Sequence, residues 1–237
     1  MTLENRVAVI TGATGGLGSV ITRELAARGV NLALLDHDPD KLAILTSSLS
    51  LPESRMLARP VDLLDPSETK SAAEAVASKF GRVDILLHLV GGWTGGKTIL
   101  EVPIDDLTLM LNQHVWTSFH VTQAFVPHLV RNGWGRLVMI TSPYAASPNA
   151  KGGPYAIGKS GQEALILTLS QELKGTGVTA NLLQAKTIDA RHEKISAPSP
   201  DNASWTTPEE LAAAILYLLS DEAGTVNGAK IPLFGPS

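Results

Sequence analysis

Short apolar runs alternate with longer amphipathic segments along most of the chain. The apolar runs, expected to be strands, cover residues 6–10, 31–35, 59–63, 83–90, 137–141, 178–184 and 230–234. Between them the pattern predicts helices over residues 19–28, 39–49, 66–80, 105–131, 154–174 and 208–220. Runs with few polar positions are typical of strands buried on both faces of a parallel sheet. The alternation therefore predicts an α/β fold, a single doubly wound parallel sheet with helices on both faces.

A glycine-rich turn follows the first predicted strand and opens the first predicted helix. It reads Thr11-Gly-Ala-Thr-Gly-Gly-Leu-Gly18. Glycine allows a tight turn and a close approach of the backbone to a ligand, and the N–H groups at a helix N-terminus favour a pyrophosphate. The sequence therefore predicts a dinucleotide site in this turn, formed by Gly12, Thr14, Gly15, Gly16, Leu17 and Gly18.

Asp36 closes the second predicted strand, 24 residues after Gly12. That separation is typical of the acid that accepts hydrogen bonds from the adenosine ribose in a dinucleotide fold. Its carboxylate would repel a 2′-phosphate, no Arg or Lys lies in the glycine turn, and the next residue is His37. We therefore expect NAD(H) to be preferred over NADP(H).

Tyr155 and Lys159 lie four residues apart in the predicted helix over residues 154–174. This spacing places both side chains on one helix face. Because a nearby ammonium favours the phenolate, we expect a lowered pKa for Tyr155 and proton exchange near neutral pH. Ser142, directly after a predicted strand, can hydrogen-bond a substrate carbonyl or hydroxyl. The three residues predict proton-transfer chemistry beside a dinucleotide.

Composition narrows the range of functions. The 237 residues suit one well-cored domain, so we expect residues 1–237 to form a single domain. The net charge of −4 argues against a nucleic acid or an anionic membrane as the main partner. Without cysteine there are neither disulfides nor thiolate metal sites, and the six histidines lack metal-ligand spacing, so no metal is expected. No leader or membrane span is visible, and we expect a cytoplasmic protein.

The order and spacing of these motifs resemble the short-chain dehydrogenase/reductase family over essentially the whole chain. The matching pieces are residues 11–18, Asp36, Val61-Asp62-Leu63, Ser142, the Tyr155–Lys159 pair, Asn181 and Asn227-Gly228. The resemblance implies a Rossmann-like domain that transfers a hydride between a nicotinamide and a small carbonyl or alcohol.

The resemblance also implies residue roles. Tyr155 would be the general acid/base, Lys159 would lower its pKa and bind the nicotinamide ribose, and Ser142 would orient the reacting oxygen. The remaining cofactor contacts would come from Asp62 and Leu63 at the adenine, Gly91 at the ribose and Ile188 at the carboxamide, and Val90 would also contact the cofactor.

Several positions depart from the family pattern. His88-Leu89-Val90-Gly91 replaces the common Asn-Asn-Ala-Gly, and Ala185-Lys186 replaces a Pro-Gly. His114 occupies the place of a middle-helix asparagine that helps carry a proton relay from the lysine. His114 is therefore either a substitute relay or a space-filling side chain. Lys186 lies near the cofactor phosphates, at the substrate mouth, or in solvent.

Local segments resemble quinonoid dihydropteridine reductase, an NADH-dependent subgroup. They cover residues 91–96, 112–118, 187–189 and 204–205. Trp93 is expected near the mouth of the site, where it could stack on a planar substrate. Residues 186–206 are expected to form a substrate-lid segment. In this segment Trp205 either contacts substrate or pins the loop onto the core.

The leading hypothesis is an NAD(H)-dependent short-chain oxidoreductase acting on a small carbonyl/alcohol substrate. The alternatives are an NADH-dependent dihydropteridine reductase-like enzyme and, in another class, an NADH-binding sensor or partner subunit with little catalysis. Gly158 and Gly161 inside the Tyr–Lys helix indicate close packing against another helix or the cofactor. With the family resemblance, this predicts a homodimer or homotetramer.

Overall fold

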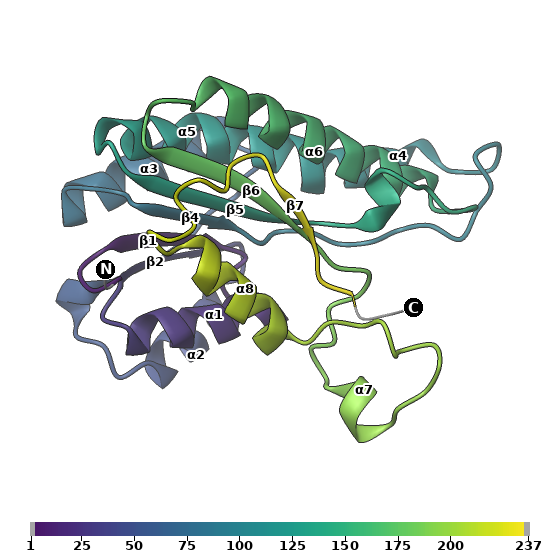
Figure 1. Ribbon diagram of the computed structural model, residues 1–237, viewed down its shortest axis with the longest axis horizontal. Coiled ribbons are helices and arrows are strands. Elements are labelled where there is room, and N and C mark those ends of the chain that lie inside the picture. Colours follow the sequence, from purple (N-terminus) through teal and green to yellow (C-terminus); the bar gives the residue numbers. More distant parts are fainter. Residues whose placement is uncertain (1–2, 235–237) are drawn as a thin grey trace.

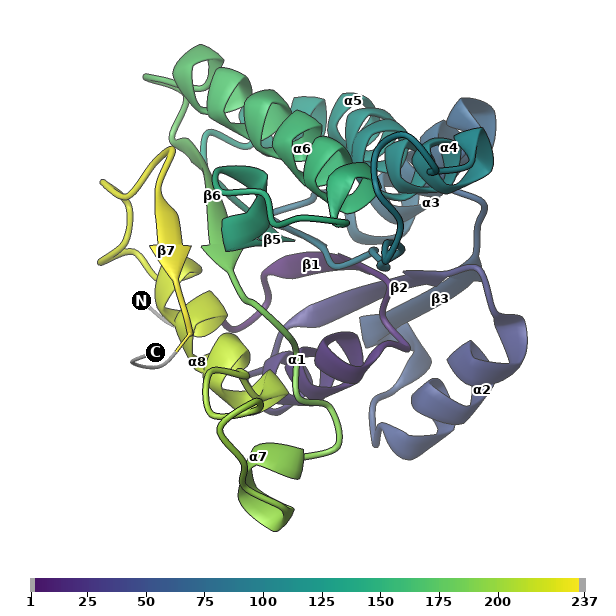
Figure 2. The same ribbon diagram turned by 90° about the vertical axis from the view of Figure 1, so that its right-hand side faces the viewer.

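The computed structural model describes residues 3–234 and contains one seven-stranded parallel sheet, in the order β3-β2-β1-β4-β5-β6-β7 (Figures 1 and 2). Its strands are β1 (Val7–Thr11), β2 (Asn31–Asp36), β3 (Met56–Pro60), β4 (Ile85–His88), β5 (Gly135–Thr141), β6 (Val178–Gln184) and β7 (Lys230–Pro232). The predicted doubly wound parallel sheet is therefore confirmed.

Helices cover both faces of this sheet. One face carries α1 (Gly16–Ala27), α2 (Pro39–Ser48) and α8 (Pro208–Leu218), and the other carries α3 (Pro66–Phe80), α4 (Ile104–Leu111), α5 (Thr117–Arg131) and α6 (Gly153–Glu172). Neighbouring residues of β1 belong to different cores: Val9 packs in the cluster with α3 and α5, whereas Ile10 packs in the cluster with α1 and α8. Burial on both faces explains why the strands read as continuous apolar runs.

Helix starts follow the signals in the sequence. The side chain of Asp38 accepts hydrogen bonds from the Asp40 and Lys41 amides at the start of α2, and Pro39 occupies the first turn. Asp65 caps α3 in the same manner. A side-chain acceptor satisfies helical N–H groups that lack an intrahelical partner, so these residues determine where each helix begins.

Two strand boundaries differ from the prediction. The third strand, expected over residues 59–63, is β3 at Met56–Pro60, the edge strand of the sheet. Pro60 is tolerated there because an edge position needs no further ladder donor. The fourth strand is shorter than expected, since β4 ends at His88 and residues 89–90 leave the sheet to line a pocket.

The middle helical region, expected as one or two helices over residues 105–131, contains a π-helical turn. This turn, η2 (Asn112–Trp116), joins α4 to α5. Short 3₁₀ segments are η1 (Glu53–Arg55) and η3 (Pro143–Ala145). A π turn inserts one residue into the helical repeat and commonly marks a functional position. Here it carries His114.

Residues 186–206 form a loop that contains the short helix α7 (Glu193–Ser196) and projects from the body of the protein (Figure 1). The two ends of the loop meet in a bridge between Ile188 and Thr206. Lys194 forms an ion pair with Glu210 of α8 at 2.7 Å, which tethers the loop to that helix. Within residues 3–234, no helix combines the length and apolar character required to cross a membrane.

Candidate active site

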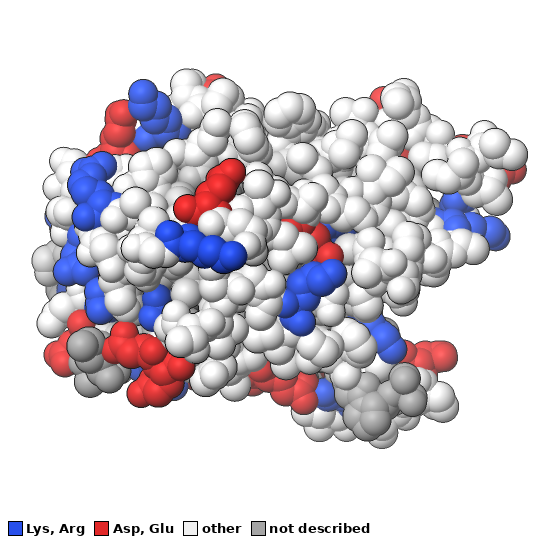
Figure 3. Space-filling model, turned by 45° about the horizontal axis from the view of Figure 1, so that its top comes forward, with Lys and Arg blue, Asp and Glu red and all other residues white. Residues whose placement is uncertain are grey.

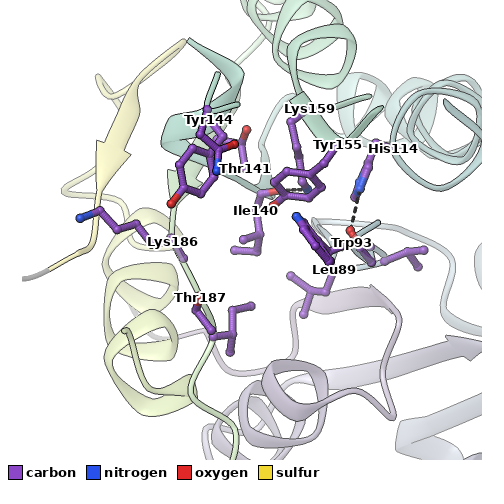
Figure 4. Close-up of a pocket in the computed structure, with 16 residues that line it drawn as sticks. Leu89, Trp93, His114, Ile140, Thr141, Tyr144, Tyr155, Lys159, Lys186 and Thr187 are labelled. Carbon is purple, nitrogen blue, oxygen red and sulfur yellow. Dashed lines mark hydrogen bonds between the residues drawn. The ribbon is translucent and has the colours of Figure 1, made fainter. Parts of the chain in front are cut away.

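A pocket of about 610 Å³ lies at the carboxyl ends of the central strands (Figure 4). In parallel α/β sheets, ligands bind at this edge. Its walls come from residues 89–93 after β4, from η2, from the end of β5, from α6 and from residues 185–188 after β6. Figure 4 shows the side chains of Tyr155, Lys159 and His114 converging from the helical layer.

The glycine turn requires glycine for steric reasons. Gly12 has a φ of +68°, and a Cβ there would lie 3.1 Å from the Val90 amide nitrogen. A Cβ on Gly18 would collide with the carbonyl oxygen of Gly12. No side chain caps the N-terminus of α1. The start of α1 therefore presents backbone N–H groups that no side chain caps, and this arrangement fits a pyrophosphate.

Asp36 is buried at the end of β2 and holds the glycine turn. Its Oδ2 atom accepts hydrogen bonds from the amide of Thr14 at 2.9 Å and from the Thr14 hydroxyl at 2.7 Å. Its Oδ1 atom accepts from the amide of His37 at 2.8 Å. The sequence predicts that Asp36 binds the ribose, but it does not reveal that Asp36 also fixes Thr14.

Two cations near the turn were also missed. Arg23 and Lys41 line a second pocket of about 210 Å³ together with Thr14. Lys41 forms an ion pair with Asp38 at 3.1 Å, and Arg23 donates to the Ser19 carbonyl at 3.2 Å. Neither residue lies within the glycine turn, so the absence of Arg and Lys from the turn does not exclude cations near it.

Lys159 lines the pocket, and its ammonium group is buried. Its Nζ atom donates to the carbonyl oxygen of Ile140 at 2.8 Å and to Oε1 of Gln162 at 3.0 Å. Burial disfavours the charged form and lowers the pKa of Lys159 to about 7, although the carboxylate of Glu163 opposes this shift. Gln162 was not among the predicted site residues.

Tyr155 shares the face of α6 with Lys159, but its pKa differs from the expectation. Burial raises the pKa of the phenol, and a hydrogen bond with Ser142 only partly opposes that shift. The predicted lowering of this pKa is therefore wrong for the free protein. The physical reason is that the Lys159 ammonium lies 6.0 Å from the centre of the Tyr155 ring and is directed toward Ile140 and Gln162.

Ser142 is buried directly beyond β5. Its Oγ atom accepts a hydrogen bond from the amide of Tyr144 at 3.3 Å and thereby caps η3. The structure places Ser142 within hydrogen-bonding reach of the Tyr155 phenol. The three residues Ser142, Tyr155 and Lys159 are thus brought together as predicted from their spacing.

His114 points from η2 toward Tyr155, and the two rings meet edge to face with centroids 5.5 Å apart. Nε2 carries the proton, because it donates to the carbonyl oxygen of Gly92 at 3.0 Å. Nδ1 is buried and has no hydrogen-bond partner in the described part of the chain. Burial, followed by the charge of Lys159, lowers the pKa of His114 to about 3, so its ring is neutral at physiological pH.

His88 forms a second buried histidine site behind the pocket. Thr117 Oγ1 donates to the Gln113 carbonyl at 2.7 Å, so Nε2–H of His88 donates to that hydroxyl at 3.3 Å. Nδ1 of His88 then accepts from the hydroxyl of Thr11 at 2.7 Å. This departure from the family pattern connects the strand that precedes the glycine turn to the start of α5.

The other predicted residues are divided between the pocket and its surroundings. The pocket lining includes Val90, Gly91, Trp93 and Ile188. Asp62 is exposed and accepts from the Leu64 amide at 2.8 Å, whereas Leu63 is buried in the core. Trp205 is half-buried in the projecting loop and does not line the pocket.

Lys186 lines the pocket on the side opposite His114 (Figure 4). Its ammonium lies 5.3 Å from the centre of the Phe234 ring. Among residues 3–234, no group of three or more His, Asp or Glu side chains is placed to hold a metal ion.

Comparisons with known proteins agree with this architecture. The chain is 28% identical to D-β-hydroxybutyrate dehydrogenase of Rhizobium meliloti (strain 1021), covering 97% of both chains. It is 28% identical to meso-2,3-butanediol dehydrogenase of Serratia marcescens, covering 99% of this chain and 95% of that protein. A short-chain type dehydrogenase/reductase structure from Mycobacterium ulcerans superposes with a TM-score of 0.89 at 26% identity, covering 98% of this chain and 90% of the other.

The family model for short chain dehydrogenase matches residues 6–199, which include the glycine turn, Asp36, Ser142, Tyr155 and Lys159. The match covers most of the chain and all of the central sheet except β7. This chain therefore belongs to the short-chain dehydrogenase/reductase family of oxidoreductases.

Proposed function

We propose that this protein is an NAD(H)-dependent oxidoreductase that transfers a hydride between the nicotinamide and a small carbonyl/alcohol substrate, with Tyr155 as general acid/base. One observation carries the proposal: the Tyr155 phenol and the buried ammonium of Lys159 line one pocket at the strand ends, and Ser142 lies near enough to the phenol to lower its pKa. Family membership supports a nicotinamide cofactor.

The glycine turn and the uncapped N-terminus of α1 fit the pyrophosphate of such a cofactor. We assign the pyrophosphate to Gly12, Thr14, Gly15, Gly16, Leu17 and Gly18. Asp36 would accept from the adenosine ribose, and Asp62 and Leu63 would lie at the adenine. Val90, Gly91 and Lys159 would contact the nicotinamide ribose, and Ile188 the carboxamide. When bound, the nicotinamide supplies or accepts the hydride.

The residues of the pocket are suited to moving a proton to the carbonyl oxygen. Because burial raises its pKa, the Tyr155 phenol remains protonated at neutral pH and can donate to the substrate oxygen during reduction. The Ser142 hydroxyl would hydrogen-bond the same oxygen. In the oxidation direction, Tyr155 would receive the proton of the alcohol, and Lys159 would stabilise the resulting phenolate.

His114 is placed to extend this path as a hydrogen-bond acceptor. Its Nδ1 atom is buried without a hydrogen-bond partner among residues 3–234, and its neutral ring cannot act as an acid at physiological pH. A Cβ on Gly91 would lie 3.6 Å from this atom and 3.8 Å from Lys159 Nζ. The missing side chain at Gly91 leaves space between the two nitrogen atoms, and a water or hydroxyl there would connect Lys159 with His114.

Asp36 supports a preference for NAD(H) over NADP(H). Its buried carboxylate accepts three short hydrogen bonds at the end of β2, where a 2′-phosphate would introduce a second negative charge. Like charges at close range in a partly buried site repel strongly. Of the two nearby cations, Lys41 is paired with Asp38.

The substrate is proposed to be a small carbonyl or alcohol compound. The names of the Rhizobium and Serratia relatives describe dehydrogenases of a hydroxy acid and a diol, and these names support this class. Trp93 lines the mouth of the pocket with 65% of its surface exposed, and this exposed ring favours a second candidate, a planar pterin. Residues 186–206 would close over either substrate and bring Trp205 nearer to the pocket.

We further propose a homodimer or homotetramer that forms through the outer helical layer. Large apolar side chains are exposed there at Leu109, Trp116, Phe119 and Ile157. Figure 3 shows charged side chains gathered at one end and along the lower edge, whereas most of the remaining surface in this view is uncharged. Such a surface is typical of a protein interface. Mass measurement by light scattering tests this, and a monomer would contradict it.

The net charge of −4 supports a small-molecule partner rather than a nucleic acid or a membrane. A chain without cysteine also suits a reducing compartment, and we propose the cytoplasm.

The proposal is tested by titrating the protein with NADH and NADPH and following nicotinamide fluorescence. Carbonyl compounds and quinonoid dihydropterin are then added to the complex. Selective NADH binding, with NADH oxidation by carbonyl compounds, supports the leading function. Oxidation by the pterin alone supports the second candidate. Tight NADH binding without turnover on the whole panel would instead indicate a sensor, and binding of neither nucleotide would contradict the proposal.

A further inference from the structure

The π turn η2 leaves a backbone carbonyl that the helix itself does not satisfy. The amide of Thr117 donates to the carbonyl of Asn112, so the carbonyl of Gln113 lacks its usual helical donor. The Thr117 hydroxyl donates to that carbonyl at 2.7 Å. The hydroxyl of Ser118 donates to the carbonyl of His114, also at 2.7 Å. Two consecutive hydroxyl groups therefore brace the turn from which the His114 ring projects.

Gln162 of α6 connects this braced turn to Lys159. Its side chain is fully buried, and its Nε2 atom donates to the Ser118 hydroxyl at 3.0 Å. Its Oε1 atom accepts from Lys159 Nζ at 3.0 Å. The Oε1 atom of Gln162 therefore accepts from the ammonium, and its Nε2 atom donates to the turn. Because an ammonium cannot accept a hydrogen bond, the side-chain amide cannot be flipped.

The contacts of Lys159 leave one donor available for the pocket. An ammonium group has three N–H donors. Two of them are directed to Ile140 O and Gln162 Oε1. The third is left for the side of the pocket, where Nζ would lie 3.8 Å from a Cβ on Gly91. The two internal acceptors therefore determine the direction of the remaining donor.

We propose that Gln162 is a positioning residue that holds the Lys159 ammonium and fixes it relative to the turn of His114. The catalytic meaning of this role rests on the proposed function, in which Lys159 and His114 act at the reacting centre. The hydrogen-bond chain from Lys159 through Gln162 and Ser118 to His114 does not depend on that function. Its physical effect on the ammonium can be measured without cofactor or substrate.

The charged form of Lys159 depends on the acceptors around it. The titratable groups that surround its ammonium are Glu163 and Tyr155 on α6, His114 in η2 and His88 on β4. Burial, followed by the charge of Lys159, lowers the pKa of both histidines to about 3, so they stay neutral above pH 5. The two histidine rings therefore stay uncharged during the titration, and their protonation does not contribute to a change in the pKa of Lys159 in a Gln162 variant.

The direct test is an NMR titration of Lys159 in cofactor-free protein with ¹³C-labelled lysine, with Lys159→Met providing the assignment. Gln162→Leu removes the acceptor, and we expect the pKa of Lys159 to fall by about 1 to 2 units, as for a lost hydrogen bond to a charged group. Gln162→Glu places a carboxylate at the same position and should raise this pKa. The Glu variant preserves size and shape, so it remains informative if the Leu variant fails to fold.

The matched control is Gln171→Leu, on the same helix. Gln171 is exposed and its Nε2 atom also donates to a serine hydroxyl, that of Ser170, at 3.4 Å. We expect no change in the pKa of Lys159 in this variant. Equal pKa values in the wild-type protein, Gln162→Leu and Gln162→Glu would overturn the proposal, as would shifts of the same sign in the two Gln162 variants.

A kinetic measurement then tests the consequence for turnover, using whichever carbonyl compound the wild-type protein reduces fastest with NADH. We expect Gln162→Leu to lower kcat about tenfold or more, with the Kd for NADH within about threefold of wild type. The alkaline loss of activity should move to lower pH in Gln162→Leu and to higher pH in Gln162→Glu. If the alkaline loss of activity occurs at the wild-type pH in both variants, the role of Gln162 in positioning Lys159 is contradicted. Absence of turnover in the wild type would refute the proposed function and leave the NMR test intact.

Discussion

The imidazole of His114 and the phenol ring of Tyr155 meet edge to face, with ring centroids 5.5 Å apart and an angle of 81° between the planes. His114 reaches this position because η2 widens the helix by one residue, and its Nε2–H is anchored on the carbonyl of Gly92. The Nδ1 atom, for which the described residues offer no hydrogen-bond partner, is therefore held in a defined orientation beside the proposed acid/base. A side chain that only filled space would need no such anchor.

The substitution His114→Phe tests whether His114 takes part in a proton relay or only fills space. Phenylalanine preserves the ring but removes the Nδ1 acceptor, so we expect kcat to fall about 100-fold while NADH binding changes little. Because the pKa of His114 is lowered to about 3, the wild-type rate should show no inflection from this residue between pH 5 and 8. The control is His128→Phe, at a half-buried position near the end of α5. A wild-type kcat in His114→Phe would show that the ring only fills space.

Asp36→Asn tests the origin of cofactor preference. The substitution removes the negative charge while one oxygen remains to accept from Thr14. We expect the ratio of the Kd for NADPH to the Kd for NADH to fall about tenfold or more, which corresponds to about 1.4 kcal/mol. Fluorescence titrations measure both constants. Asp105→Asn, which removes an exposed carboxylate at the start of α4, is the control and should leave the ratio unchanged.

Lys159 also gives the fold a pH-dependent stability. Burial lowers its pKa from 10.5 to about 7, so between these values the unfolded chain holds a proton that the folded chain has released. Below pH 7 Lys159 is protonated in both the folded and the unfolded chain, so the folded state bears the full cost of burying the ammonium. Stability from this group therefore increases as pH rises from 7 to 10.5, by at most about 1.4 kcal/mol per pH unit.

Lys159→Met removes this penalty. We expect a higher Tm than wild type at pH 6, with a difference that shrinks as pH approaches 10. Thermal unfolding across this range checks the prediction, and Lys174→Met, at an exposed position, is the control. A difference in Tm that does not depend on pH would contradict a buried, titrating ammonium.

The sheet, its flanking helices and the order of the site motifs could be predicted because each depends on local pattern. Apolar runs mark strands buried on both faces, and Asp38 and Asp65 mark helix starts. The places of Ser142, Tyr155 and Lys159 in the predicted elements, with the family resemblance, predicted that the three lie near one another. These features need no knowledge of contacts between distant segments.

The features that escaped prediction depend on such contacts. Nothing in the periodicity around His114 reveals the one-residue insertion of η2, because apolar positions continue on both sides of it. The role of Gln162 requires Ser118, which is 44 positions away in sequence. The pKa of Tyr155 was predicted with the wrong sign because the spacing of Lys159 was known but the direction of its ammonium was not.

The most direct test of the central claim compares Tyr155→Phe with the wild-type protein in NADH-dependent carbonyl reduction. Phenylalanine keeps the ring that contacts His114 but removes the hydroxyl that donates the proton. We expect kcat to fall by a factor of about 10² to 10⁴, while the Kd for NADH stays within about threefold of the wild-type value. Wild-type turnover in Tyr155→Phe would contradict the assignment of Tyr155 as the general acid/base.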